Sequence, residues 1–450
     1  MTSAVVSSWH AAAVHIPPPL LFTDGRERTS RIPLALTPAP EPAAGAVEAP
    51  GAPAVTRVTR AVLALGIVLL LLATSGWTTV RQRPLSGPPR EAALAAWERD
   101  RIDGRPLPAP AGAPPRTVAA FFARLGPDRA ERLAARHPLV VGNLNGAPAA
   151  LRYRANRISL SRALTAERGR VDDPRLTAEG RHEALRRVHR FTSLLRPERQ
   201  VLAFDPTGTG RTAEVLGDLE RAERISVIVP GVDTNLLTFQ KTHNRYGAPA
   251  GMARALYEAE RRTAPGARIA VIAWADYTAP AAVNVDAATG RLAAHGAERL
   301  VALTSALPGH ARVALFCHSY GSVLCGIAAP RLPGRVTDLA VAGSPGMRAE
   351  RAEDLGTPAR VWAMRDPDDW IADVPHLEVG GIGHGADPAE PEFGARILSA
   401  AGAAGHSGYF EPGTESLGNL AAIGVGAYER LVCAHADRAC HDGIFAAEGL

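Results

Sequence analysis

Lysine is almost absent from this 450-residue chain, although basic residues as a whole are plentiful. Lys241 is the only lysine among 50 basic residues, so arginine supplies nearly all of the positive charge. Residues 151–200 alone carry thirteen arginines against six acidic residues. No motif typical of nucleic-acid binding accompanies this charge. We therefore expect a solvated helical face there rather than an anion-binding surface, and no nucleic-acid partner.

Cysteine is scarce as well. The four cysteines form no C-x-x-C pair and show no zinc-ligand spacing, so we expect no metal site. Cys317 and Cys325 lie in apolar contexts and are predicted to be small, buried hydrophobic residues. Cys433 and Cys440 lie near the C-terminus, where a local disulfide is predicted in an oxidising compartment. Their spacing also suits a loop in which they never pair.

The N-terminal part contains one long run without any charge. Residues 1–56 are rich in alanine and proline, lack hydrophobic periodicity and are predicted to be disordered. Residues 57–83 hold the uncharged run 61–80, flanked by arginines on both sides. Because about 20 apolar residues span a bilayer, we predict a single membrane anchor with the rest of the chain extracytoplasmic. The alternative is a secreted protein whose signal peptide starts near Val55 and is cleaved near residues 73–75.

The remaining chain divides into a helical part and an alternating part. Residues 84–116 form a linker around a short helical piece. Residues 117–198 place apolar residues at three- and four-residue spacing, which predicts a small helical subdomain with a turn-rich interruption at 139–160. In residues 199–450, strand-like apolar runs alternate with helical segments, which predicts a mostly parallel sheet with helices on both faces.

The strand-like runs in this part cover residues 200–206, 213–219, 224–231, 268–277, 312–319, 338–346, 360–366 and 396–400. The predicted helices, besides the one after residue 319, cover residues 249–263, 291–307 and 415–433.

Residues 313–322, VALFCHSYGS, are the most informative segment of the chain. The apolar run ends abruptly at Ser319, Gly321 follows, and helix-compatible sequence continues. Strand, sharp turn and helix with a serine at the apex are typical of the nucleophile elbow of α/β-hydrolases. Ser319 also ends the fifth strand-like run, as such a serine should. Cys317 stands where glycine is usual, and the alternative interpretation is an ordinary helix N-cap.

A catalytic serine needs a histidine base and a carboxylate that orients it, and in α/β-hydrolases they follow in the order Ser, Asp or Glu, His. The loop after the run at 360–366 offers Asp369, which we prefer because Trp-Ile follows it, and Asp366 as the alternative. His406 follows the last strand-like run and is the predicted base. His384 is the rival, but it lies too close to Asp369 in the sequence for a helix and a strand between them.

The oxyanion of a tetrahedral intermediate needs two backbone N–H donors. One should be the amide of Tyr320, directly after the serine. The other should come from the loop VPGVDTN after the third strand-like run. Gly231 allows that backbone to turn toward the serine, so Val232 is the predicted second donor. Gly231 could instead be an ordinary glycine between strand and loop.

Long collinear segments resemble a bacterial family of α/β-hydrolases of unknown function with an HSYGS elbow. They include HPLVVGNLNGAPAALRYRANR, VPGVDT, WADYTAP, CHSYGS, GSPGM, DPDDWI, GHGADPAEPEFGARIL and GHSGYF, and they run from about Ala119 to Ala422. The resemblance implies an α/β-hydrolase fold and a triad of Ser319, Asp369 and His406. It implies no substrate.

These patterns predict a serine hydrolase that acts on carboxylic esters, either small molecules or lipids, through an acyl-enzyme. No metal and no cofactor are expected, and the sequence does not indicate an oligomeric state. Two alternatives stay open. The chain could be a membrane-anchored binding module without catalysis on a hydrolase fold, or it could use the same triad for acyl transfer or haloperoxidase-like chemistry.

Overall fold

The computed structural model describes residues 88–434 and 438–444. The predicted tail 1–56, the uncharged segment 57–83 and the start of the linker lie outside the described residues. Within the part that is described, no helix is both long enough and apolar enough to cross a bilayer. The membrane anchor therefore stays a prediction.

An eight-stranded sheet forms the centre of the molecule, in the order β12-β9-β8-β7-β5-β6-β4-β3. In this order, each pair of neighbours among β12, β9, β8, β7, β5 and β6 is parallel. Strand β4 is antiparallel to both of its neighbours, β3 and β6. The strands are β3 Gln200–Asp205, β4 Arg211–Gly217, β5 Arg224–Val229, β6 Ile269–Ala275, β7 Arg312–His318, β8 Val336–Ala342, β9 Arg360–Met364 and β12 Arg396–Ile397. The predicted mostly parallel sheet is thus confirmed.

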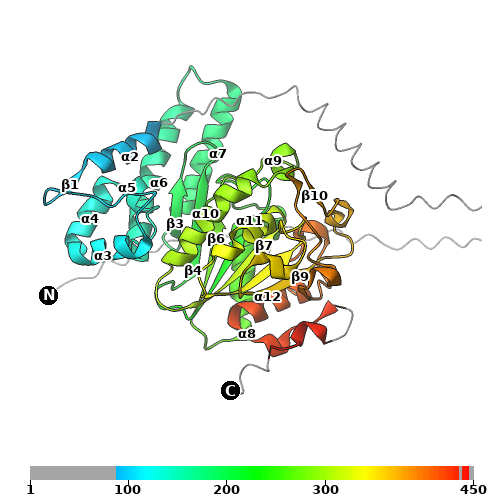
Figure 1. The fold of residues 1–450 in the computed structure, drawn as a ribbon. Coiled ribbons are helices and arrows are strands. Elements are labelled where there is room, and N and C mark those ends of the chain that lie inside the picture. The colour runs from blue at the N-terminus through cyan, green and yellow to red at the C-terminus, as the bar shows by residue number, and fades with distance from the viewer. Residues whose placement is uncertain (1–87, 435–437, 445–450) are drawn as a thin grey trace, which may run out of the picture. The chain divides into compact units, whose positions relative to one another are not determined.

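Helices cover both faces of this sheet, which is why most residues of its central strands are apolar. Along β7, Val313 and Leu315 belong to the hydrophobic cluster on one face, and Ala314 and Phe316 belong to the cluster on the other. The first cluster includes helices α10 and α11, and the second includes α8 and α12 (Figure 1). These helices are α8 Pro249–Thr263, α10 Arg291–Ala306, α11 Tyr320–Ala328 and α12 Glu415–Val425.

Most helices before the sheet share a separate core, in which Trp97, Phe122 and Leu133 are buried, whereas Leu164 and Phe191 from the last two of them belong to a hydrophobic cluster of the sheet. These helices are α2 Pro88–Arg99, α3 Pro115–Leu125, α4 Pro127–Arg136, α5 Pro138–Val141, α6 Ala149–Val171 and α7 Ala178–Leu194, with a two-stranded hairpin of β1 Arg101–Ile102 and β2 Arg105–Pro106. The buried Asn156 amide ties α6 to the sheet, because it donates to the carbonyls of Gly142 and Val201 at 2.9 and 3.0 Å.

Two predicted boundaries were wrong. The turn-rich segment expected at 139–160 ends early, because α6 begins at Ala149, directly after Pro148, and contains no proline. The last helix, expected to reach Cys433, ends at Val425. Gly426 follows with a φ of 75°, a left-handed conformation that ends α-helices.

The predicted disulfide between Cys433 and Cys440 is confirmed, with a Cα–Cα distance of 5.5 Å. The prediction for the other two cysteines was wrong in one respect. Cys317 and Cys325 are buried, as expected, but they are bonded to each other. The elbow helix folds back along β7, so residues eight positions apart in the sequence become neighbours with a Cα–Cα distance of 6.5 Å.

A fully buried glutamate lies between the sheet and two of these helices. Glu260 on α8 accepts a hydrogen bond from Ser226 on β5, and its second carboxyl oxygen has no hydrogen-bond partner among the described residues. Gly424 on α12 lies so close to this carboxyl that a Cβ there would clash. Burial raises the pKa of Glu260 from its ordinary 4.5 to about 8, so this carboxyl is protonated at neutral pH.

This burial predicts a pH-dependent loss of stability. The unfolded chain releases the Glu260 proton near pH 4.5 and the folded chain near pH 8, so stability falls as the pH rises between these values. Glu260→Gln removes the titration. Between pH 5 and pH 8, the free energy of unfolding of the wild type should fall by roughly 2–4 kcal/mol relative to that of the variant. Thermal denaturation at several pH values measures this. Glu258→Gln, exposed on the same helix, is the control, and parallel curves for wild type and Glu260→Gln would contradict the prediction.

Candidate active site

Ser319 lies at the apex of a sharp turn between β7, which ends at His318, and α11, which begins at Tyr320. Its backbone has φ 55° and ψ −130°, a conformation that non-glycine residues rarely adopt. Surrounding hydrogen bonds hold it there. The Ser319 amide donates to the carbonyl of Ala342 at 3.0 Å, and the Ser322 hydroxyl donates to the Ser319 carbonyl at 2.6 Å. A strained residue fixed in this way is typical of a functional site.

Two glycines make room for this turn. A Cβ on Gly321 would lie 2.2 Å from the carbonyl oxygen of Val229, so only glycine fits where the elbow helix crosses β5. A Cβ on Gly231 would lie 2.6 Å from the Ser319 Cβ. The backbone of the loop after β5 therefore approaches the serine side chain directly.

The structure brings Ser319, His406 and Asp369 together in one hydrogen-bonded chain. His406 Nε2 lies 2.9 Å from Ser319 Oγ, and His406 Nδ1 lies 2.9 and 3.0 Å from the two carboxyl oxygens of Asp369. An ionised carboxylate only accepts hydrogen bonds, so Nδ1 carries the proton and Nε2 accepts from the serine hydroxyl. This tautomer is the one in which a histidine can take the serine proton.

Asp369 is buried and held ionised by its partners. Burial by itself would raise the pKa of this carboxyl, but hydrogen bonds from His406, the Tyr409 hydroxyl and the Ile371 amide outweigh it and lower the pKa below its ordinary value. The Tyr409 hydroxyl lies 2.6 Å from Asp369 Oδ2. It also accepts a hydrogen bond from the Asp366 amide at 3.0 Å, so it fixes the loop and the carboxylate together.

The two rival residues lie elsewhere. The Asp366 carboxyl accepts a hydrogen bond from the Asp368 amide at 2.9 Å and shapes the turn before Asp369. His384 Nε2 bonds to the carbonyl of Ala287 at 2.7 Å. Neither side chain has a hydrogen bond to Ser319 within the described part of the chain.

The predicted oxyanion donors, the amides of Val232 and Tyr320, belong to segments that adjoin Ser319. Tyr320 is the first residue of α11, a position whose N–H has no partner within a helix. Among the described residues, no acceptor is bonded to the Val232 amide. The buried hydroxyl of Tyr277 donates to the Pro230 carbonyl at 2.5 Å and thereby fixes the loop that carries Val232.

Sequence reasoning missed three buried residues that position this site: Tyr277, Tyr409 and His318. His318 donates from Nε2 to the His406 carbonyl at 2.6 Å. Burial, and then the neighbouring His406, lower the pKa of His318 to about 4, so it stays neutral and does not compete for the serine proton. All three lie in segments that carry the family resemblance, namely CHSYGS, WADYTAP and GHSGYF, but the sequence alone does not reveal their contacts with distant segments.

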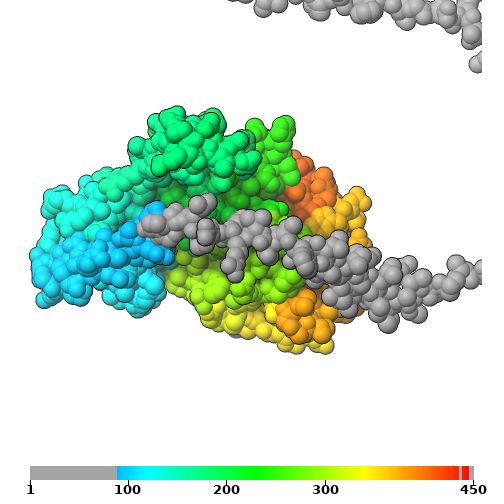
Figure 2. Space-filling model, turned by 90° about the horizontal axis from the view of Figure 1, so that it is seen from above, coloured from blue at the N-terminus to red at the C-terminus, as the bar shows by residue number. Residues whose placement is uncertain are grey.

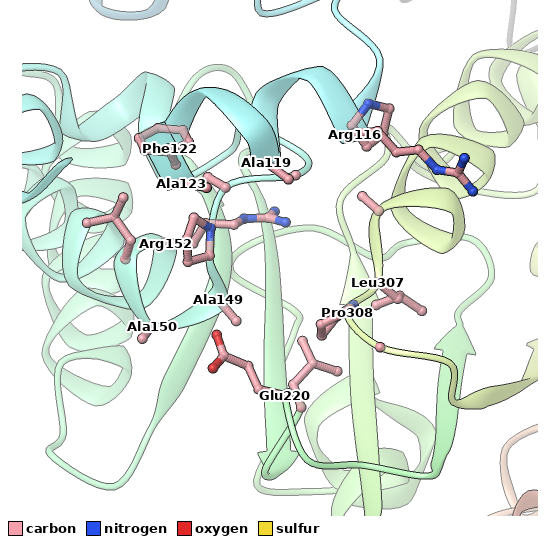
Figure 3. A pocket seen from close by; sticks show the side chains of 18 of the residues that line it. Arg116, Ala119, Phe122, Ala123, Ala149, Ala150, Arg152, Glu220, Leu307 and Pro308 are labelled. Carbon is pink, nitrogen blue, oxygen red and sulfur yellow. The ribbon is translucent and has the colours of Figure 1, made fainter. Parts of the chain in front are cut away.

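A large cavity of the described part, shown in Figure 3, lies outside the candidate active site. It has a volume of about 1140 Å³ and lies between the helices before the sheet and the segments that lead into β7 and β8. Phe122, Arg152 and Leu307 are among its lining residues, and no triad residue is. Parallel strands place catalytic loops at their carboxyl ends, and this cavity lies at the opposite ends.

One cluster among the described residues brings metal-ligand atoms together, namely those of Cys433, Cys440 and His441. Its two cysteines are bonded to each other, so neither offers a thiolate. This cluster therefore does not fit a metal in the form that the structure shows.

Comparison with known proteins supports the hydrolase class. A family model described as alpha/beta hydrolase matches residues 205–379, a range that includes Ser319 and Asp369 but not His406. Together with the mostly parallel sheet and its elbow, this match identifies an α/β-hydrolase fold.

Two uncharacterized proteins, from two strains of Mycobacterium tuberculosis, are each 27% identical over 397 residues. The alignment covers 74% of this chain, and the chain spans only 58% of the length of these relatives. Among solved structures, dienelactone hydrolase from Anabaena variabilis is similar at 17% identity and a TM-score of 0.33, over 52% of this chain and 99% of that one. The 2,6-dihydroxy-pseudo-oxynicotine hydrolase is similar at 13% identity and a TM-score of 0.27, over 63% and 79% of the two chains.

The Cys317–Cys325 bond joins the strand before Ser319 to the helix after it, so its removal should loosen the elbow. For a loop this short, loss of the cross-link costs about 2–3 kcal/mol of stability. We expect Cys317→Ala/Cys325→Ala to lose that much in chemical denaturation and to react at least tenfold more slowly with a fluorophosphonate at Ser319. Cys433→Ala/Cys440→Ala is the control and should lose stability only. Equal reactivity of the two double variants would contradict this role.

Proposed function

We propose that this protein is a serine hydrolase that cleaves carboxylic esters through an acyl-enzyme. The observation that supports it most strongly is the continuous hydrogen-bonded chain from Ser319 Oγ through His406 to the Asp369 carboxylate. In support, the strained backbone at Ser319 accompanies a hydroxyl within hydrogen-bond distance of that histidine, and the segments with the Val232 and Tyr320 amides adjoin the serine. A binding module without catalysis would have no need for this arrangement.

In the first half of the reaction, Ser319 Oγ attacks the ester carbonyl while His406 Nε2 takes the hydroxyl proton. The carbonyl π electrons move to its oxygen, and the amides of Val232 and Tyr320 donate to the resulting oxyanion. Asp369 stabilises the imidazolium that forms. When the oxyanion collapses, the bond to the alcohol breaks, the alcohol oxygen takes the proton from His406 Nε2, and the acyl group stays on Ser319.

In the second half, water replaces the alcohol. His406 Nε2 takes one proton from the water as its oxygen attacks the acyl carbon. Collapse of the second tetrahedral intermediate breaks the bond to Ser319 Oγ, which regains its proton from His406. The products are a carboxylic acid and the free serine. Esters are the proposed substrates because their alkoxide is a better leaving group than an amide nitrogen.

The direct test is covalent labelling with a fluorophosphonate, followed by hydrolysis of a panel of p-nitrophenyl esters of increasing acyl length. Wild type should be labelled, and Ser319→Ala should lose labelling and at least about a thousandfold in hydrolysis rate. Asp366→Asn should remain active, whereas Asp369→Asn should not. Absence of labelling in folded wild type, judged by circular dichroism, would rule out the proposed function.

The contact between Tyr277 and the oxyanion loop generates a further prediction. Tyr277→Phe removes the hydrogen bond to the Pro230 carbonyl, so the Val232 amide should be held less firmly. We expect kcat for p-nitrophenyl butyrate to fall about tenfold with KM within twofold, because the loss concerns the transition state. Tyr153→Phe is the matched control, since the buried Tyr153 hydroxyl has no hydrogen-bond partner among the described residues. Equal kcat values for both variants would show that the Tyr277 hydroxyl does not position the loop.

A further inference from the structure

Exposed apolar side chains gather in two segments of the described chain. Among the described residues, eight large hydrophobic side chains are exposed. Six of these eight fall within residues 283–285 and 370–382. The six, called the apolar rim below, are Val283, Val285, Trp370, Leu377, Val379 and Ile382. The most exposed are Val283 at 72% and Val379 at 70%. Scattered apolar residues need no explanation, but a group of six indicates a surface that binds something.

The two segments lie side by side. Helix α9, Val285–Ala288, is followed by Thr289, which forms an isolated β-bridge with Ile382. Ile382 belongs to the hairpin of β10, Glu378–Val379, and β11, Ile382–Gly383. The ring of His384 bonds to the Ala287 carbonyl at the same junction. In Figure 1, α9 and β10 appear next to each other at one edge of the molecule, in agreement with these contacts.

The apolar rim adjoins the candidate active site. The hydroxyl of Tyr320, the residue after Ser319, donates to the Thr289 carbonyl at 3.0 Å. On the other side, Trp370 directly follows Asp369, and its ring lies 4.7 Å from the ring of His406, centroid to centroid. Trp370 is also 46% exposed, so one side chain reaches from the catalytic histidine to the surface.

Two ion pairs lie beside the rim, whereas the exposed Asp373 within residues 370–382 forms no ion pair in the described part of the chain. Arg348 lies 2.8 Å from Glu378 on the hairpin, and Arg291 lies 3.0 Å from Asp286 on α9. Each pair is neutral as a whole. These two pairs therefore add no net charge beside the apolar side chains of the rim. They do not oppose the approach of the rim to an apolar surface.

We propose that the apolar rim docks on the surface of aggregated lipid and that the substrate is an acyl ester presented by that surface. This inference rests on the proposed function and names its substrate class. Apolar side chains next to polar ones bind at the boundary between headgroups and acyl chains, where their apolar area leaves water. An ester in such a surface has its carbonyl at this boundary, close to the level of Trp370 and His406.

A lipid surface fits this position better than a protein does. A folded partner, including a second copy of the chain, would cover Trp370 and close the way to Ser319. A lipid surface instead supplies the ester at that place. The sequence-based prediction for residues 61–80 is compatible with this arrangement, because only residues 81–87 separate that run from α2. Seven residues span at most about 25 Å, so a membrane-inserted run would hold the domain near the bilayer.

The first experiment compares two substrates on the full-length chain. The rim variant is Val283→Ser/Val285→Ser/Val379→Ser/Ile382→Ser, and the matched control is Leu185→Ser/Val432→Ser, which removes the two exposed hydrophobic residues outside the rim. The substrates are dissolved p-nitrophenyl acetate and a tributyrin emulsion above its solubility. We expect the rim variant to lose at least tenfold on the emulsion and to stay within twofold of wild type on the acetate. The control should match wild type on both.

The outcomes separate this inference from the proposed function. If the rim variant matches wild type on the emulsion, or loses equally on both substrates, the docking inference is overturned while the serine hydrolase stands. If wild type is not labelled by a fluorophosphonate at all, the proposed function fails, and docking is then decided by a measurement that needs no turnover.

That measurement uses phosphatidylcholine vesicles with brominated acyl chains, which quench tryptophan fluorescence on contact. The proteins are Ser319→Ala and Ser319→Ala/Trp370→Phe, so that the difference between their signals isolates Trp370. We expect the vesicles to quench this difference signal, and the four rim substitutions in the same background to abolish the quenching. An unquenched Trp370 signal would overturn the inference. A second outcome would also overturn it: sedimentation shows a dimer that the rim substitutions dissociate, and the vesicles do not quench Trp370.

Discussion

The chain reverses direction at Ser319 in a space where two backbones nearly touch. Gly321 passes so close to the Val229 carbonyl that a single Cβ would clash, and a Cβ on Gly231 would clash with the serine itself. The serine takes a positive φ there, and its hydroxyl lies beside the loop after β5 and within hydrogen-bond distance of His406. The rest of the site is arranged around this turn, because His406 and the loop with Gly231 both lie next to the buried serine, and Trp370 of the apolar rim packs against His406.

Buried polar contacts hold the other members of the site. Tyr409 fixes Asp369, Tyr277 fixes the loop with Val232, and His318 fixes the backbone of His406. Each of these groups is shielded from water. In such a buried place an unsatisfied hydrogen-bonding group is costly, so a hydrogen bond that forms there favours a single geometry. The disulfide below the elbow adds a covalent link between the same strand and helix. The site is thus rigid at its base, while the apolar rim faces the solvent.

Apolar runs predicted the strands of the sheet well, since strands covered on both faces need apolar residues along their length. The helix boundaries that failed did so for local reasons. The predicted turn-rich segment contains Gly142, Gly146 and Pro148, but all three precede α6, which begins at Ala149. At the other end of the chain, Gly426 ends α12 before the apolar pattern ends. The order of Ser319, Asp369 and His406 was readable because the fold determines which strand each residue follows.

The sequence by itself determined the chain order of the strands, the position of the elbow and the candidate residues of the triad, because these depend on local composition and on order along the chain. Only the tertiary structure decided which aspartate lies against His406 and that Cys317 bonds to Cys325. It also decided that six exposed apolar residues from two distant segments form one rim. These features are contacts across space, between residues whose neighbours in the sequence give no sign of them.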